Sequence, residues 1–163
     1  MAGNIMTPNM VWGDFKVNKN PDTETIKTYE TDGILFEKLY IEGRSTDSGT
    51  VKIFGVMARK NVGEKQPALL IAGDVKEKNY ESVALAFAKK GYCTLVVDVA
   101  GDDGTNKEFT VYPNDIEYAN YSVSEKTLFT VTDSAKATCF YEWGAVCRNA
   151  YDYLKTLSWI TDI

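Results

Sequence analysis

The chain of 163 residues contains no histidine. Histidine is the side chain that most often serves as a general base near neutral pH, because its imidazole titrates in that range. Without it, a serine or cysteine of this chain lacks the usual partner that removes its proton during nucleophilic attack. The residues given are therefore not expected to form a catalytic acid–base site by themselves.

Cysteine is also scarce, and its spacing excludes the common metal motifs. The three cysteines, Cys93, Cys139 and Cys147, form no CxxC pair. With no histidine available, a zinc site would need scattered cysteines and carboxylates, so no metal is predicted. Cys93 falls in a strand pattern and Cys147 on the apolar face of a helix, and we interpret both as buried thiols that pack as small apolar side chains.

Cofactor and cation motifs are missing as well. Residues 101–104 read Gly-Asp-Asp-Gly, which is neither a dinucleotide fingerprint nor a phosphate loop, and the carboxylates would repel a pyrophosphate. Asp98, Asp102, Asp103 and Asp115 could hold a hard cation, but their spacing does not match an EF-hand and a solvated loop is favoured. No cofactor is predicted.

The charge and the absence of long apolar runs limit the partners. The formal charge is −5 and the pI is about 4.8, which disfavours binding to nucleic acid phosphates. No apolar run approaches the roughly 20 residues that span a bilayer. The composition, 44% hydrophobic and 25% charged, is that of a globular domain. We predict a cytoplasmic protein that binds neither nucleic acid nor membrane.

The pattern along the chain divides it into an N-terminal arm, residues 1–33, and a domain, residues 34–163. The arm is polar and punctuated by glycine and proline, and Trp12 is the side chain expected to dock it. Residues 34–42 and 50–59 are rich in β-formers, and the turn-forming residues 43–49 separate them. This pattern predicts a hairpin with a long turn.

A strand–helix–strand unit follows the hairpin. Residues 68–72 are apolar at every position, which is typical of a strand covered on both faces. Asn79 can cap a helix with helical apolar spacing that ends before Gly91, and residues 93–99 form a second strand. Residues 101–140 lack periodicity, residues 141–157 form an amphipathic helix, and a further strand is expected to begin in residues 158–163.

Local phrases resemble the α/β-hydrolase family. Residues 86–92, ending in Gly-Tyr, precede an apolar strand that closes on Asp98 and Gly101, and residues 151–154 with Trp159 and Asp162 resemble the helix that leads to the nucleophile strand. The resemblance covers residues 34–163 and is nearest to the acetyl-xylan-esterase, dienelactone-hydrolase and prolyl-oligopeptidase-like branches. It implies an α/β fold of three layers, with an N-terminal β-hairpin and a parallel β-α-β unit. The sheet would be incomplete, lacking the C-terminal half.

The resemblance also implies a function for the intact protein. The family's serine follows the next strand in a Gly-x-Ser-x-Gly turn, and this sequence contains no such pattern, so no catalytic residue is assigned. The backbone of Gly73, Asp74 and Val75 matches the loop that supplies an oxyanion-hole donor. We expect an inactive N-terminal fragment of a serine hydrolase that cleaves a small-molecule ester or a peptide.

An alternative remains open. The chain would then be a non-catalytic α/β binding or assembly module, with the aromatic-rich residues 109–141 as its contact surface, because tyrosine is favoured at interfaces. The resemblance further implies that residues 68–72 form an open sheet edge. Such an edge predicts a homo-oligomer through residues 68–72, or cover from the N-terminal arm.

Overall fold

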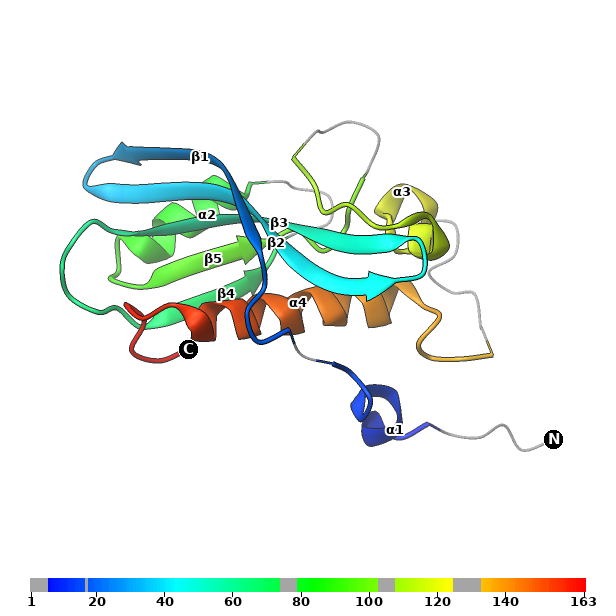
Figure 1. Cartoon of the computed structure of the whole chain (residues 1–163). Helices are drawn as coiled ribbons and strands as arrows, with labels where there is room; N and C mark the ends of the chain where they lie inside the picture. Colours follow the sequence, from blue (N-terminus) through cyan, green and yellow to red (C-terminus); the bar gives the residue numbers. More distant parts are fainter. Residues whose placement is uncertain (1–5, 17, 74–78, 103–107, 125–132) are drawn as a thin grey trace.

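The computed structural model describes residues 6–16, 18–73, 79–102, 108–124 and 133–163 (Figure 1). In chain order the elements are α1 (Pro8–Trp12), β1 (Thr23–Thr31), β2 (Ile34–Thr46), β3 (Gly49–Lys60), β4 (Ala68–Ala72), α2 (Tyr80–Ala88), β5 (Cys93–Val97), the 3-10 helix η1 (Asn114–Ala119), α3 (Tyr121–Ser124) and α4 (Cys139–Thr156).

The strands form one mixed sheet in the order β1-β2-β3-β5-β4. The pairs β1–β2, β2–β3 and β3–β5 are antiparallel, and the pair β4–β5 is parallel. The chain leaves β4, passes through α2 and returns as β5, which gives the predicted strand–helix–strand unit. The α/β character, the β2–β3 hairpin and the parallel pair are therefore confirmed.

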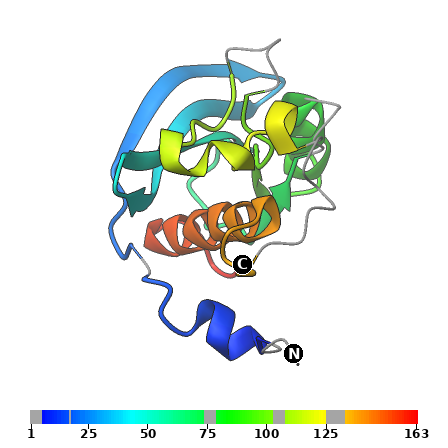
Figure 2. The ribbon, with the colours of Figure 1, turned by 90° about the vertical axis from the view of Figure 1, so that its right-hand side faces the viewer.

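Helices cover both faces of the sheet (Figures 1 and 2). On one face α2 packs its Tyr80, Ala84 and Ala88 against apolar side chains of β2, β3 and β5. On the other face α4 packs Val146, Ala150 and Leu154 against a second apolar cluster. Every residue of β5 is buried, because this strand lies between two others and beneath both layers.

The hairpin turn is shorter than predicted, and this expectation was wrong. β2 continues to Thr46 and β3 begins at Gly49, which leaves Asp47 and Ser48 as the connection. The turn-forming residues 43–46 lie within β2, where a register shift interrupts the ladder between Glu42 and Ser45. Gly43 is buried there against Val51, so its small size serves close packing.

The predicted arm contains a strand that the sequence did not indicate. β1 pairs with β2 from Thr23 opposite Ile41 to Thr31 opposite Ile34. Its residues are exposed except for the half-buried Tyr29, so the strand carries no alternation of apolar side chains. Trp12 docks the preceding residues, as predicted: its ring stacks on Tyr141 of α4 with centroids 4.7 Å apart. The division of the chain at residue 33 remains a prediction.

β4 is the outer strand, as the resemblance implied, but the arm does not cover it. Trp12 of the arm docks on α4, and β1 of the arm forms the opposite edge of the sheet. Residues from the C-terminal end reach the start of β4 instead (Figure 1). Gln66 forms a parallel bridge with Ile160, and the Ala68 N–H donates to the Asp162 carbonyl at 2.6 Å. Strand-like pairing at the chain's C-terminal end is therefore present. Self-association through residues 68–72 remains a prediction.

The cysteines are free, as expected of thiols that pack as apolar side chains. Cys93 and Cys139 are buried and Cys147 is partly buried. Burial raises the pKa of the Cys93 thiol from 9.0 to about 12, and it also raises the pKa of Cys147. A thiol held neutral in this way is a weak nucleophile.

We predict that the free energy of unfolding falls as the pH rises from about 9 to about 12. In this window the native Cys93 thiol keeps its proton, because its pKa is about 12, while the thiol of the unfolded chain loses its proton near 9.0. Urea unfolding across the window measures the slope. Cys93→Ala should reduce the slope, whereas Val96→Ala, at another fully buried position of β5, should lower stability without changing it. An unchanged slope in Cys93→Ala would contradict the assignment.

Candidate functional site

The carboxyl ends of β4 and β5 lie side by side, where parallel sheets usually place a binding site. Gly73 follows β4 at this edge. Its N–H donates to the Val97 carbonyl at 2.8 Å, and a Cβ at this position would overlap the ring of Tyr80. The backbone donor of Gly73 is therefore engaged with β5. Asp74 and Val75, the other residues predicted for the oxyanion hole, lie outside the described residues, and the assignment stays a prediction.

Asp98 follows β5 at the same edge and is completely buried. Its Oδ1 accepts hydrogen bonds from the Tyr80 hydroxyl at 2.7 Å and from the Ala100 N–H at 3.2 Å. Its Oδ2 accepts from the N–H groups of Gly101 and Thr110 at 3.0 and 2.7 Å. The carboxylate thus joins α2, the end of β5 and the returning segment, which agrees with a role in shaping the strand end.

The segment after β5 is fixed by further contacts to the same backbone. The Thr110 hydroxyl donates to the Asp98 carbonyl at 2.6 Å and accepts from the Phe54 N–H at 3.0 Å. The Tyr112 hydroxyl donates to the Val99 carbonyl at 2.7 Å, and burial raises its pKa well above 10.0. Tyr112 therefore stays a neutral hydrogen-bond donor within the core.

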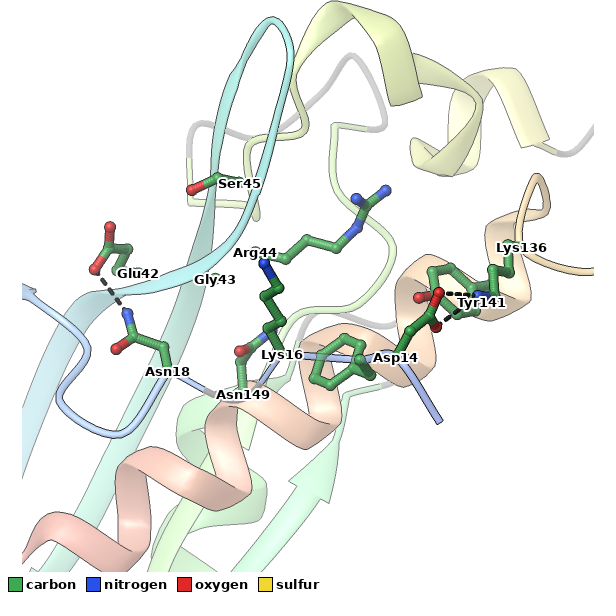
Figure 3. Close-up of a pocket in the computed structure, with 11 residues that line it drawn as sticks. Asp14, Lys16, Asn18, Glu42, Gly43, Arg44, Ser45, Lys136, Tyr141 and Asn149 are labelled. Atoms are coloured by element: carbon green, nitrogen blue, oxygen red, sulfur yellow. Dashed lines mark hydrogen bonds and ion pairs between the residues drawn. The ribbon is translucent and has the colours of Figure 1, made fainter. Parts of the chain in front are cut away.

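A cavity of about 690 Å³ lies between the arm, β2 and α4 (Figure 3). The arm contributes residues around Phe15 and Lys16, β2 contributes Glu42 and its neighbours, and α4 contributes Tyr141 and Asn149. The volume is in the range of small-molecule sites, roughly 300–1,000 Å³. The sequence did not indicate this cavity, because its walls are far apart along the chain.

Ion pairs and hydrogen bonds occupy part of the cavity wall. Lys136 contacts both carboxylate oxygens of Asp14, at 2.6 and 2.7 Å, and this pair lowers the pKa of Asp14. Glu42 Oε2 accepts hydrogen bonds from the Asn18 amide at 2.9 Å and from the Asp22 N–H at 3.3 Å. These contacts join the arm to the turn before α4 and to β2.

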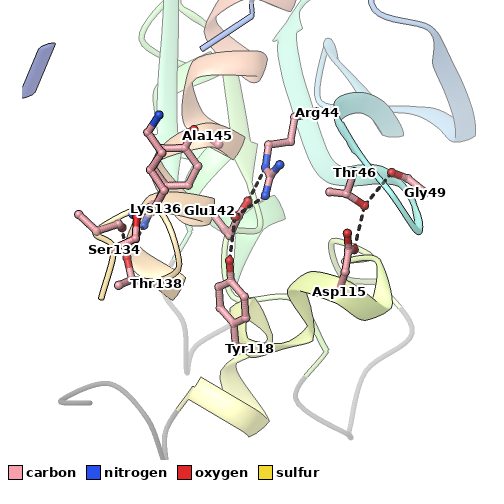
Figure 4. A network of polar contacts seen from close by, with 12 residues as sticks. Arg44, Thr46, Gly49, Asp115, Tyr118, Ser134, Lys136, Thr138, Glu142 and Ala145 are labelled. Atoms are coloured by element: carbon pink, nitrogen blue, oxygen red, sulfur yellow. Dashed lines mark hydrogen bonds and ion pairs between the residues drawn. The ribbon is translucent and has the colours of Figure 1, made fainter. Parts of the chain in front are cut away.

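A buried ion pair lies beside the cavity (Figure 4). Arg44 Nε and Nη2 donate to the two oxygens of Glu142 at 2.7 and 2.5 Å, and the Tyr118 hydroxyl donates to Glu142 Oε1 at 3.2 Å. The Glu142 side chain is 1% exposed and that of Arg44 is 26% exposed. The hydrogen bond to Glu142 raises the pKa of Arg44, and burial raises that of Tyr118 to about 12.

This ion pair holds three elements together. Arg44 comes from β2, Tyr118 from η1 and Glu142 from the first turn of α4. Loss of Arg44 would leave a buried carboxylate without its cation, whereas loss of Glu142 would leave a guanidinium that still reaches water. The bidentate geometry therefore fixes α4 against β2 in one register.

The sequence analysis did not identify Glu142, Asn149 or Arg44 as site residues. Both Glu142 and Asn149 are polar residues of the predicted amphipathic helix, yet they are 1% and 3% exposed. Their separation of seven residues places them on one helix face, which was the available signal. Arg44 was placed in a turn. Among the described residues, no group of three or more histidine, cysteine or acidic side chains could hold a metal ion, and no helix is long and apolar enough to cross a bilayer.

Comparison with known proteins shows a similarity of fold. Comparisons with known protein families and with curated proteins found no match. Among solved structures the fold is similar to an acetyl xylan esterase from Paenibacillus sp. R4, with a TM-score of 0.53 and 16% identity. The match covers 92% of this chain and 45% of the esterase, so the chain spans less than half the length of that structure. The likeness is one of fold, to an enzyme of the α/β-hydrolase type.

We predict that Asp98→Asn lowers the free energy of unfolding by about 3 kcal/mol, because the amide keeps one acceptor and turns an NH2 group toward buried donors. Urea unfolding measures the change. Tyr80→Phe should cost about 1 kcal/mol, since it removes one donor and keeps the ring that packs on Gly73. Asp47→Asn, in the exposed hairpin turn, should change stability by less than about 0.5 kcal/mol. A cost for Asp98→Asn no larger than that of Asp47→Asn would refute the role given to Asp98.

Proposed function

We propose that this chain forms the N-terminal half of a serine hydrolase of the α/β type, which cleaves a carboxylic ester or a peptide bond in the intact protein, and that the chain is inactive alone. The observation that carries the proposal is the outer edge of β4. Gln66 and Ala68 pair there in parallel fashion with residues 159–162. A further parallel strand at this edge would extend the sheet, and this chain matches only 45% of the longer esterase.

The described residues would supply the scaffold of the site. β4 and β5 would place their carboxyl ends beneath the substrate, and Asp98 would hold the segment after β5 in place. In acyl transfer, backbone N–H groups stabilise the negative charge that develops on the carbonyl oxygen. Because the Gly73 N–H is engaged with Val97, the donors proposed for this task are the N–H groups of Asp74 and Val75.

The nucleophile and its base would have to come from sequence beyond the residues given. A serine nucleophile needs a general base within hydrogen-bond reach, and this chain contains no histidine. A small-molecule ester or a peptide is the proposed substrate of the intact protein.

The alternative, a non-catalytic binding or assembly module, has less support from the described aromatics. Tyr112 is buried in the core, and Tyr118 donates its hydroxyl to Glu142 inside the domain. Among the described aromatic residues of the 109–141 segment, Phe140 is largely exposed, at 59%, and the others are buried or half-buried. Most of the described aromatics in this segment therefore stabilise the chain's own fold.

The reading frame downstream of codon 163 tests the proposal. We expect it to continue into a Gly-x-Ser-x-Gly turn and a later histidine. The protein made from the whole frame should hydrolyse p-nitrophenyl acetate, and a fluorophosphonate should label that serine. Residues 1–163 alone, assayed beside it, should release p-nitrophenol no faster than buffer.

Two results would contradict the proposal. Fluorophosphonate-sensitive turnover by pure residues 1–163 would show that the chain carries its own nucleophile. A stop codon directly after Ile163 would exclude the catalytic half and favour the binding module.

A further inference from the structure

The cavity between the arm, β2 and α4 presents two charges of opposite sign. Asp14 is neutralised by Lys136, and Arg44 by Glu142. Lys16 and Glu42 then remain as the charged groups of the wall. Within the described part of the chain Lys16 makes no ion pair or hydrogen bond, and Glu42 accepts only from uncharged donors, both at Oε2.

Lys16 and Glu42 do not pair with each other. Figure 3 shows Lys16 on the arm and Glu42 on β2 beside Asn18, and both residues line the cavity. Opposite charges that face one cavity without a direct ion pair can be joined by a molecule that carries both charges.

Asn149 contributes a buried polar side chain to the wall of the cavity. The residue is 3% exposed and lines the cavity from α4. Its Nδ2 donates to the Ala145 carbonyl at 2.9 Å, while its buried Oδ1 accepts no hydrogen bond from any described residue. A buried acceptor of this kind in a native protein usually accepts from an ordered water.

We propose that this cavity binds a zwitterionic α-amino acid. The carboxylate of the ligand contacts the Lys16 ammonium, and the ligand's ammonium donates to the free Oε1 of Glu42. The aromatic rings of Phe15 and Tyr141, which also line the cavity, contact an apolar or aromatic ligand side chain. The proposal is independent of the hydrolase function, because none of these residues belongs to the carboxyl ends of β4 and β5.

The arm makes this site dependent on its own docking. Trp12 stacks on Tyr141, and the Arg148 guanidinium lies 5.3 Å from the ring of Trp12 and 4.8 Å from that of Phe15. Because Lys16 and Phe15 lie on the arm, a bound ligand would contact the arm and α4 together and would stabilise the docked state.

Isothermal titration of the full chain with L-phenylalanine tests the proposal. The amino acid should bind saturably at one site with a dissociation constant below about 1 mM. N-acetyl-L-phenylalanine lacks the positive charge and L-phenylalanine methyl ester lacks the negative charge. Each should bind at least about tenfold more weakly, because each loses one charge-assisted contact.

Two variants locate the site. Lys16→Met and Glu42→Gln keep the size of the side chain and remove one proposed contact each, and each should weaken the binding of L-phenylalanine by about tenfold. Lys19→Met and Glu64→Gln make the same charge changes at exposed positions outside the cavity and should leave binding unchanged. Unaltered melting temperatures of the unliganded variants would separate loss of binding from loss of folding.

Several results would overturn the proposal. One is the absence of saturable binding of L-phenylalanine at concentrations up to about 10 mM. Another is equal binding of the amino acid and its two derivatives, which would indicate apolar contact alone. Binding that persists unchanged in both cavity variants would place the ligand elsewhere on the molecule.

Discussion

The arrangement of this fold depends on the hydrogen bonds that the buried carboxylate of Asp98 accepts. A charge that is removed from water is tolerated only when hydrogen bonds replace its hydration. Here the replacement comes from the Tyr80 hydroxyl on α2 and from backbone N–H groups of Gly101 and Thr110. A single side chain therefore couples the helix on one face, the end of the central parallel strand and the segment that returns to β3.

The position of Tyr80 connects this carboxylate to β4. Its ring lies so close to Gly73 that no side chain fits there, while its hydroxyl reaches Asp98. The ends of both parallel strands are thus held by one aromatic residue. On the opposite face the pair of Arg44 and Glu142 has the corresponding task, because it fixes α4 against β2 beside the arm and its cavity. Buried ionic groups organise both layers that flank the sheet.

The sequence predicted the elements that carry periodic apolar patterns. Residues 68–72 were recognised because they are apolar at every position, and the helix around Ala84 because its apolar side chains recur at helix spacing. β1 escaped recognition, since an exposed edge strand buries almost no side chain. Gly43 and Ser45 were taken as turn residues, although a register shift accommodates them inside β2. Turn propensity describes single residues, whereas the length of a hairpin is decided by its pairing.

The candidate sites were predicted less completely than the fold. Gly73 stands directly after one predicted strand and Asp98 near the end of the next, so the sequence alone placed them at one sheet edge. The cavity depends on Lys16, Glu42 and Asn149, which come from three separated segments. Such residues come together only in the folded chain. Asn149 is also buried, although a polar residue is expected at the surface. No local sequence pattern therefore predicts the cavity.

Amide hydrogen exchange along β4 tests most directly the central claim that this strand is the outer edge of the sheet. N–H groups alternate in direction along a strand, and that of Gly73 donates to β5 while that of Ala68 donates to Asp162. In a dilute, monomeric sample, exchange should be slow at Leu69, Ile71 and Ala68 but fast at Leu70 and Ala72. Equally slow exchange at all five residues would contradict the account, because another segment would then cover the edge.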